Sequence, residues 1–253
     1  MQISINLWSI RDYFSTRDRA IGSLHKLKGM GFEAVELCHS PDMLSIETMV
    51  NLCSDMGLSV SGIHDITVTE DPDLAVARAT MAQCKYVTFP YPAERDLTKI
   101  EVVKELSHDL NEAGKVLHQN DLHLTYHNHD LEFAFCGEAR VIDILANHTS
   151  SEFVHFQFDV YWIKAAGLNP QHWCEKYSDR LTQLHLKDLT TYSQAQNVKS
   201  CPLGHGEIDW QSILTTVPNA QITIEQEHFH QDPFADFARS IHFLKTTLSK
   251  TLN

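Results

Sequence analysis

The sequence has few basic residues and no long apolar run. Lysine and arginine together number 20 against 33 aspartates and glutamates, so the formal net charge is -13 at pH 7. Such a charge repels a phosphate backbone, and we expect no nucleic-acid partner. No segment approaches the roughly 20 apolar residues of a membrane-spanning helix, and the first residues, MQISINLWSIRDYF, lack the pattern of a secretion signal. We therefore expect a cytoplasmic protein without a membrane partner.

Paired cysteine motifs and glycine-rich nucleotide motifs are also missing. The six cysteines are scattered without a C-x-x-C spacing, which argues against a disulfide framework and against a thiolate metal site. No G-x-G-x-x-G follows the first predicted strand, and no G-x-x-x-x-G-K loop occurs. The nucleotide-binding kinds of α/β protein therefore lack their signature.

Short apolar runs alternate with helical patterns along the chain. Eight runs have the length and composition of strands: ISI near residue 3, EAVELC near 33, LSVSGIH near 58, KYVTFP near 85, LHLTYHN near 122, FVHFQFDVY near 153, LTQLHLKD near 181 and QITIEQE near 221. Helical spacing covers Ala20–Gly29, Ser45–Met56, Leu74–Ala82, Lys99–His118, Ala139–Asn147 and Pro233–Leu248. Strand followed by helix, repeated along the chain, indicates a parallel sheet with helical crossovers.

The length favours closure of that sheet into a barrel. The chain has 253 residues, close to the roughly 250 of a (β/α)8 barrel, and 43% of them are hydrophobic. We predict one (β/α)8 (TIM) barrel domain over residues 1–253, running from Met1 to about Leu248, with the last helix near the first strand. The sequence leaves association into a homo-oligomer open.

Polar side chains stand where the predicted strands end. They are Glu36, His64, His127, His129, Asp159, His185, Lys187, Glu225 and Glu227. For any one of them alone, a polar residue that begins a loop is the better explanation. The C-terminal ends of barrel strands meet at one face, where the active sites of such barrels form. We therefore expect the group as a whole to surround one pocket.

Three of these groups end strongly apolar strands and are typical metal ligands. Asp159 follows FVHFQF, His185 lies between two leucines, and Glu225 follows ITI. A buried carboxylate is costly to ionise, and a cation offsets that cost. A mixed carboxylate and imidazole set favours Mn2+, with Mg2+, Co2+, Fe2+ and Zn2+ as alternatives. The competing interpretation is a buried ion-pair network that only stabilises the barrel mouth.

Several segments carry a family resemblance. They are GFEAVEL (31–37), LTYHNHDLEF (124–133), FDVYWIKAAG (158–167), LHLKD (184–188), LGHGEIDW (203–210) and IEQEHF (224–229). With them the chain resembles the sugar phosphate isomerase/epimerase family of xylose isomerase-like barrels. The resemblance implies a divalent metal held by Glu, Asp, His and Glu on the fifth to eighth strands. Asp159, His185 and Glu225 match the last three of these ligands.

The chain departs from the family pattern at the fifth strand. There His127, in HNH, takes the place of the glutamate in ENH. The fourth ligand is then either His127 or Glu132 from the following loop, and we expect His127. Alternation along the strand supports this choice, because Thr125 and His127 face inward when Tyr126 faces the helices.

The resemblance implies proton transfer next to a carbonyl group of a small sugar or polyol. A divalent ion that holds the carbonyl stabilises the enediolate formed when the neighbouring proton leaves. The candidate catalytic groups are Glu225, Glu132 and His127. A sugar isomerase or epimerase is the leading hypothesis. The alternative is a lyase or dehydratase of a keto-polyol or 3-keto-sugar, similar to an inosose dehydratase, because it begins with the same enediolate.

Two further hypotheses come from the same superfamily. An AP endonuclease would need a three-metal cluster and a basic DNA groove, and the acidic balance of the chain argues against it. A non-catalytic sugar-binding barrel would hold no tightly bound metal. Elemental analysis of the purified protein would separate that last hypothesis from an enzyme.

Substrate contacts are expected from His64, His129, Trp162, Lys187 and His205. Lys187 suits a substrate oxygen or phosphate, and a salt bridge with the neighbouring Asp188 is an equally good explanation. Core packing is the better explanation of Trp162 or Trp8 taken singly. For His205, in the GHGEIDW segment, a place at the pocket mouth and a simple helix-entry turn are equally supported.

Overall fold

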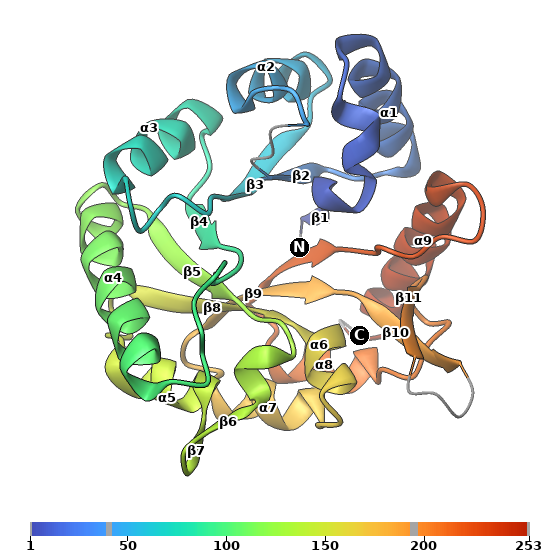
Figure 1. Ribbon diagram of the computed structural model, residues 1–253. Coiled ribbons are helices and arrows are strands. Elements are labelled where there is room, and N and C mark those ends of the chain that lie inside the picture. Colours follow the sequence, from blue (N-terminus) through green and yellow to red (C-terminus); the bar gives the residue numbers. More distant parts are fainter. Residues whose placement is uncertain (1, 39–41, 193–196, 252–253) are drawn as a thin grey trace.

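Eight parallel strands form a closed barrel in this computed structural model, which describes residues 2–38, 42–192 and 197–251 (Figure 1). In order around the ring the strands are β1 (Ile3–Asn6), β12 (Gln221–Ile224), β9 (Leu181–Leu186), β8 (Val154–Asp159), β5 (His123–His127), β4 (Tyr86–Phe89), β3 (Ser59–His64) and β2 (Ala34–Cys38). β1 pairs with both β2 and β12, so the ring has no open edge. The predicted (β/α)8 barrel is confirmed.

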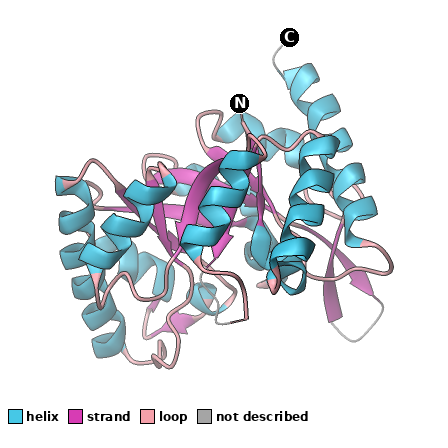
Figure 2. Cartoon of the chain, turned by 90° about the horizontal axis from the view of Figure 1, so that it is seen from above, coloured by secondary structure: helices cyan, strands magenta, loops and turns pink. Residues whose placement is uncertain are grey.

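Helices surround the strands on the outside of the barrel (Figures 1 and 2). They are α1 (Arg17–Met30), α2 (Ile46–Asp55), α3 (Pro72–Ala82), α4 (Ile100–Gln119), α5 (Val141–His148), α6 (Val160–Ala165), α7 (Pro170–Lys176), α8 (Trp210–Thr216) and α9 (Pro233–Thr251), with the 3-10 helices η1 (Leu7–Phe14) and η2 (Leu131–Phe133). α9 contacts both α1 and α8, so the helical layer also closes on itself.

Local signals in the sequence set where the helices begin and end. Asp71 caps α3 by accepting a hydrogen bond from the backbone N–H of Leu74 at 3.0 Å, and Pro72 takes the first helical position. Gly31 ends α1 in the left-handed region, with a φ of 95°. The helix expected from Ala139 begins two residues later instead, because Ala139 belongs to the short strand β7.

Two hairpins and three short helices lie outside the predicted pattern. β6 (Phe135–Cys136) pairs with β7 (Ala139–Arg140), and β10 (Asp188–Tyr192) pairs with β11 (Asn197–Cys201), both antiparallel. The longer hairpin, β10–β11, extends from the end of β9 away from the barrel (Figure 1). Helices α6, α7 and α8 have only six or seven residues each, too few for a clear helical period in the sequence.

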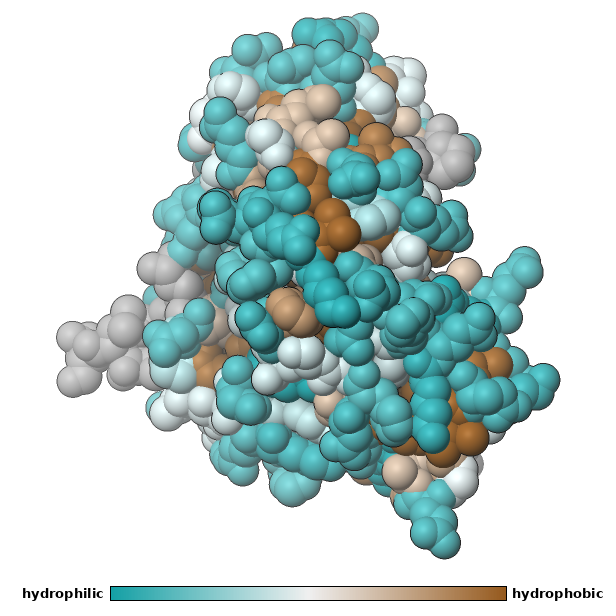
Figure 3. Space-filling model, turned by 90° about the vertical axis from the view of Figure 1, so that its left-hand side faces the viewer, coloured by the Kyte–Doolittle hydropathy of each residue, from teal (hydrophilic) through white to brown (hydrophobic). Residues whose placement is uncertain are grey.

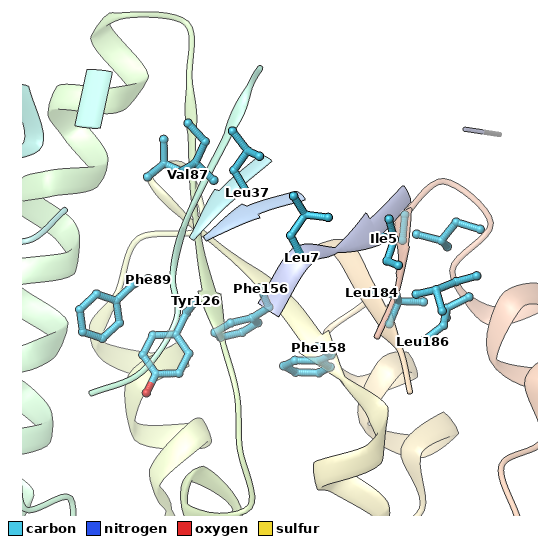
Figure 4. Packing of buried hydrophobic residues seen from close by; sticks show 14 of the residues in the cluster. Ile5, Leu7, Leu37, Val87, Phe89, Tyr126, Phe156, Phe158, Leu184 and Leu186 are labelled. Carbon is cyan, nitrogen blue, oxygen red and sulfur yellow. The ribbon is translucent and has the colours of Figure 1, made fainter. Parts of the chain in front are cut away.

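Alternation along the strands separates outward apolar side chains from inward polar ones. Leu124, Tyr126, Phe156 and Phe158 are buried on the helix side, and Figure 4 shows the last three packed along neighbouring strands. Burial of such a side chain contributes ~1.5–3 kcal/mol. The layer between strands and helices is therefore the main hydrophobic core, while the helices are mainly hydrophilic outside, as the side over α3 and α4 shows (Figure 3).

Hydrogen-bonded polar side chains fill the barrel interior. The hydroxyls of Ser4 and Ser61 lie 2.6 Å apart, and those of Thr88 and Thr125 lie 2.7 Å apart. Thr125 also donates to Gln183 Oε1 at 2.9 Å. All five are buried, where other TIM barrels carry mostly branched apolar residues. This polar interior leads directly to the carboxyl ends of the strands.

Among the described residues, no helix is both long and apolar enough to cross a bilayer.

Candidate metal and substrate site

Four potential metal ligands meet at the carboxyl ends of four neighbouring strands. His127 ends β5, Asp159 ends β8, His185 lies near the end of β9, and Glu225 directly follows β12. One ligand atom from each lies within 4.8 Å of the others, and all four side chains are buried. The expected set of His127, Asp159, His185 and Glu225 therefore forms one compact cluster.

Asp159 leaves one carboxylate oxygen without a hydrogen bond. Its Oδ1 accepts from the backbone N–H of Tyr161 at 3.0 Å, whereas the buried Oδ2 has no hydrogen-bond partner among the described residues. The Lys187 ammonium lies 3.6 Å from Oδ2. Burial raises the pKa of Asp159 to about 7, and Lys187 only partly opposes that effect. A buried, unsatisfied oxygen in a mixed O and N donor set fits a divalent cation.

His185 lies between two carboxylates. Its Nδ1 is 2.5 Å from Glu225 Oε2, and its Nε2 is 2.6 Å from Glu36 Oε2. Burial opposes a charge on the ring, but the two carboxylates outweigh burial and raise the pKa of His185 to about 10. Without a metal ion the ring is therefore an imidazolium, and it can offer a nitrogen to a metal only after it loses a proton.

Gln157 fixes how the histidine rings are protonated. Its side chain lies 2.7 Å from Glu36 Oε1, and because a carboxylate only accepts hydrogen bonds, the amide Nε2 must face Glu36. The amide oxygen then faces His64 Nε2 at 2.8 Å and His127 Nδ1 at 3.0 Å, so both rings donate to it. His127 is left with Nε2 as its basic nitrogen. Burial and the nearby His185 lower the pKa of His127 well below its usual value, which keeps this ring neutral.

Glu36 is among the strand-end side chains expected around the pocket, but the sequence alone indicates no role for it as ligand, base or substrate contact. It is fully buried and accepts hydrogen bonds from Asn6, Gln157 and His185. Burial works against its ionisation, but His64 and His185 hold the pKa of Glu36 well below its usual range. A signal was present, because an acidic residue in the apolar run EAVELC must point either into the helix layer or into the barrel.

Lys187 is enclosed by carboxylates from three directions. Its ammonium lies 3.1 Å from Glu225 Oε1 and 3.6 Å from Asp159 Oδ2, and it donates to Glu227. The ammonium also lies 5.0 Å from the centre of the Trp162 ring. The neighbouring Asp188 contributes nothing to this pairing, because both of its oxygens accept hydrogen bonds from other groups.

Glu132 lies apart from the four-ligand cluster. Its Oε1 accepts from the hydroxyl of Tyr126 at 2.7 Å, and its Oε2 accepts from the backbone N–H of His129 at 2.7 Å. The Tyr126 ring packs with apolar side chains on the helix side of β5 (Figure 4), and its hydroxyl holds Glu132 on that side rather than in the barrel mouth. Burial raises the pKa of Glu132 to about 7.

The expected substrate residues divide between the site and the surface. His129 and Trp162 contact each other, with ring centres 5.3 Å apart, and His64 stacks on His185 at 5.3 Å. Burial lowers the pKa of His129 to about 4, so its ring is neutral. His205 is exposed, and it is not among the residues that line the cavity above the cluster.

A cavity of 320 Å³ opens above the cluster. Its size is at the lower end of the range for small-molecule sites. It is lined by Asn6, Trp8, Cys38, His64, Ile66, Pro90, Tyr91, His127, His129, Glu225 and Glu227. Both acidic lining residues follow β12, and the imidazole and aromatic groups follow β1, β3, β4 and β5.

Both the sequence and the fold have relatives among known proteins. A family model described as the xylose isomerase-like TIM barrel matches residues 24–247. An inosose dehydratase from Clostridium botulinum (strain Eklund 17B / Type B) is 29% identical over 122 residues, which cover 43% of this chain and 40% of that relative. A sugar phosphate isomerase/epimerase structure from Parabacteroides distasonis ATCC 8503 has a TM-score of 0.81 and 20% identity over 96% of this chain and 97% of that chain.

A second solved structure is a xylose isomerase-like TIM barrel protein from Mycobacterium smegmatis in complex with magnesium. It has a TM-score of 0.74 and 14% identity, over 100% of this chain and 98% of that chain. At such identities the structural likeness shows the fold alone. The chain spans about half the length, or less, of the curated relatives that it matches. The family model covers most of the sequence, and the chain belongs to the xylose isomerase-like TIM barrel family.

Proposed function

We propose that this protein is a divalent-metal-dependent sugar isomerase or epimerase that moves a proton next to a carbonyl group. The observation that carries the proposal is the four-ligand cluster below a cavity of small-molecule size. A stabilising network usually gives every buried carboxylate oxygen a hydrogen bond, whereas Asp159 Oδ2 has only the longer 3.6 Å contact with Lys187 and no hydrogen-bond partner among the described residues. This oxygen supports a metal site over a purely structural network.

The residues that would hold the ion are His127, Asp159, His185 and Glu225. We propose Mn2+ as the ion, with Mg2+, Co2+, Fe2+ and Zn2+ as alternatives, because the donors are carboxylate oxygens and imidazole nitrogens. When bound, such an ion polarises a substrate carbonyl and stabilises the negative charge that develops beside it. His127 stands where the family pattern has a glutamate, and a neutral imidazole carries no negative charge. The proposed ligand set therefore has one negative charge fewer than the family pattern implies.

Glu225 is the group that we propose removes the proton. It lines the cavity, and although burial opposes its ionisation, Lys187 and His185 lower the pKa of Glu225 well below its usual value. The side chain is therefore a carboxylate at neutral pH. Removal of a proton beside the carbonyl leaves an enediolate. Return of that proton to the adjacent carbon, with transfer of the hydroxyl proton from one oxygen to the other, completes an isomerisation.

The far wall of the cavity favours a reaction with one carboxylate base. β4 and β5 lie across the ring from β12, and the described lining residues that follow them are Pro90, Tyr91, His127 and His129, none of which is acidic. Glu132 is held behind β5 by Tyr126 and the backbone of His129. We therefore propose that Glu132 positions His129 and that Glu225 carries the proton.

A dehydratase is the second candidate function. One base that removes a proton beside a carbonyl also begins the loss of water from a keto-polyol, and no second carboxylate is then needed on the opposite face. The curated relative that is named inosose dehydratase supports this candidate. The two reactions differ in whether a hydroxyl leaves the neighbouring carbon after the proton has gone.

One experiment tests both candidates. The protein is loaded with Mn2+ and incubated in deuterated water with a panel of ketoses and keto-inositols, and products are followed by proton nuclear magnetic resonance. An isomerase or epimerase exchanges a carbon-bound proton without loss of water, whereas a dehydratase produces an unsaturated or deoxy product. Absence of both outcomes across the panel, with the metal bound, contradicts the proposed function. The Glu225→Gln protein, with its metal content measured, is the matched control.

A further inference from the structure

The cavity has an acidic wall and no lysine or arginine among its described lining residues. Glu225 and Glu227 belong to the lining, and the carboxylates of Asp159 and Glu36 lie close behind Glu225. The undescribed segments, residues 39–41 and 193–196, contain no lysine or arginine either. Four carboxylates therefore act on this space, and Lys187 together with a divalent ion would offset three of their four negative charges.

The one buried ammonium beside the cavity is already neutralised. Lys187 interacts with Glu225, Glu227 and Asp159, and among the described residues these are its three carboxylate partners. A phosphate group that approached Lys187 would have to displace a carboxylate or lie beside one, at a cost in Coulomb repulsion.

Arg11 is the cation next to the rim. Its guanidinium stacks on the Trp8 ring at 4.5 Å and donates to the Trp8 carbonyl oxygen. Arg11 lines a separate surface hollow together with Asp12, Ser15, Arg19 and Asp42. It is not among the residues that line the main cavity.

The glycine-rich loop before α8 holds one of the chain's own carboxylates. Asp188 Oδ2 accepts from the backbone N–H groups of Gly204 at 2.9 Å and Gly206 at 3.2 Å, and from Trp210 Nε1 at 2.9 Å. Its Oδ1 accepts from two further backbone N–H groups. Converging N–H groups in a loop form an anion site, and the loops after strands seven and eight often bind phosphate in TIM barrels. Here that anion position is filled by Asp188, which is fully buried.

The close packing of the loop against Asp188 explains why residue 206 is a glycine. A Cβ atom at Gly206 would overlap the Asp188 carboxylate and the carbonyl oxygen of Leu189. The backbone therefore approaches Asp188 more closely than any other residue type permits at that position. No room remains between the loop and Asp188 for a second anion.

Apolar side chains form the remaining rim of the cavity. Trp8, Ile66 and Tyr91 are 39%, 39% and 43% exposed, and Pro90 lies beside Tyr91 in the lining. These surfaces match the C–H faces of a sugar or cyclitol ring, whereas a phosphate dianion placed against them would lose hydration without gaining a partner.

We propose that the site accepts uncharged sugars or cyclitols and discriminates against their phosphate esters. This inference rests on the proposed function, because it names the substrate class of the same cavity. Three independent features support it: the neutralised Lys187, the loop filled by Asp188, and the apolar rim. The hydroxyl groups of a neutral ligand can form hydrogen bonds with the carboxylates and imidazoles of the site. Such a ligand brings no additional charge into the cavity.

The test measures binding rather than turnover. The Mn2+-loaded full chain is titrated with D-fructose, D-tagatose, D-ribulose and an inosose, and with the terminal phosphate ester of each ketose. Binding is followed by the fluorescence of tryptophan, since Trp8 lines the cavity. Each ketose that binds is expected to bind about tenfold or more tightly than its ester. Inorganic phosphate is expected not to displace a bound neutral ligand. The proposal is overturned if no neutral ketose binds more tightly than its ester, or if inorganic phosphate competes.

Two variants that each lose one negative charge test the role proposed for Lys187. Glu227→Gln removes one carboxylate from the Lys187 ammonium, and we expect the preference for the neutral ligand over its ester to shrink about threefold or more. Glu207→Gln removes the same charge from an exposed residue that bonds the backbone N–H of Thr191 outside the cavity. The preference should not change in that control. An equal effect of both variants would show that overall charge, and not the neutralised Lys187, sets the preference.

The result of this binding test can be distinguished from the result of the test of the proposed reaction. Selective binding of neutral ligands without any proton exchange would reject the proposed reaction and leave this inference standing. Proton exchange on a phosphate ester with the neutral sugar unreactive and unbound would reject the inference and leave the reaction standing.

Discussion

His185 and Glu36 form a close buried pair, with His185 Nε2 2.6 Å from Glu36 Oε2. Because Glu225 takes the other ring nitrogen, the imidazole is charged when no metal is present. In the proposed metal site one nitrogen of this ring is a ligand, while Glu36 can keep its hydrogen bond to the second nitrogen. Glu36 therefore acts as the partner that fixes the ring and supports the ligand.

Metal affinity is predicted to rise with pH. The pKa of His185 is raised to about 10 in the metal-free protein, so at neutral pH a bound ion must displace its proton. Burial raises the pKa of Asp159 to about 7, so below that pH a second proton must leave. We expect the association constant to rise about tenfold per pH unit above pH 7 and more steeply between about pH 6 and 7. Isothermal titration calorimetry with Mn2+ in buffers of different ionisation enthalpy measures the protons released. Release of no proton would show that His185 is neutral or is not a ligand.

The metal-free protein is predicted to lose stability at alkaline pH. The pKa of His185 in the folded chain, about 10, is above the value of about 6.5 for an unfolded histidine. The stabilising contribution is complete below about pH 6.5 and is lost as pH rises towards 10, because the unfolded chain releases the proton first. Urea unfolding of the metal-free protein at several pH values measures this. The slope should disappear in the His185→Gln variant.

His127 and Glu132 are predicted to behave differently on substitution. His127→Ala removes a ligand and should lower Mn2+ affinity by more than about 100-fold, with loss of turnover. Glu132→Gln should leave the metal content unchanged and lower turnover, since it alters only the hydrogen bonds to Tyr126 and His129. Elemental analysis and steady-state kinetics measure both effects. Loss of metal from the Glu132 variant with retention in the His127 variant would mean that the two roles are reversed.

Gln157 is predicted to support metal binding through His127. Gln157→Leu removes the acceptor that holds His127 Nδ1 and leaves Glu36 with one hydrogen bond fewer. We expect Mn2+ affinity to fall about 10- to 100-fold. Gln183→Leu is the matched control, since Gln183 bonds Thr125 and Gln221 deeper in the barrel and contacts no ligand. Both variants should lower stability by about 1–3 kcal/mol, and equal metal affinities in the two would contradict the role of Gln157.

Two glycines in helices are predicted to respond oppositely to alanine. A Cβ at Gly114 in α4 would lie 2.5 Å from the carbonyl oxygen of Phe153, so Gly114→Ala should destabilise the protein by about 1–3 kcal/mol. A Cβ at Gly22 in α1 would meet nothing within 4 Å, and Gly22→Ala should stabilise by about 0.5–1 kcal/mol. Urea unfolding of the two variants gives both values. The same sign in both would show that the Phe153 contact does not decide the effect.

The fold could be predicted from the alternation of apolar and polar residues along short stretches of the sequence. Alternation in LTYH was enough to place Thr125 inward and Tyr126 outward, as the hydrogen bonds of both residues confirm. The hairpin that begins at Asp188 was missed because LTTY continues directly from a barrel strand, with no turn residue between them.

The site was less predictable than the fold because it depends on residues far apart in the chain. Glu36 and His185 are separated by 149 positions, and only closure of the barrel brings them together. Lys187 shows the same limit, since Asp188 is its neighbour in sequence while Glu227 is its partner in space. Glu132 was the alternative to His127 as fourth ligand, and nothing in the sequence indicates that its carboxylate accepts a hydrogen bond from the Tyr126 hydroxyl.

The central claim is that one divalent ion is bound by the ends of four strands, and anomalous diffraction from crystals soaked in Mn2+ tests it most directly. We predict one strong manganese peak within roughly 2.0–2.3 Å of ligand atoms of His127, Asp159, His185 and Glu225. The Asp159→Asn protein, crystallised in the same way, should show a much weaker peak. A manganese peak elsewhere, with no ion among these four side chains, would contradict the account.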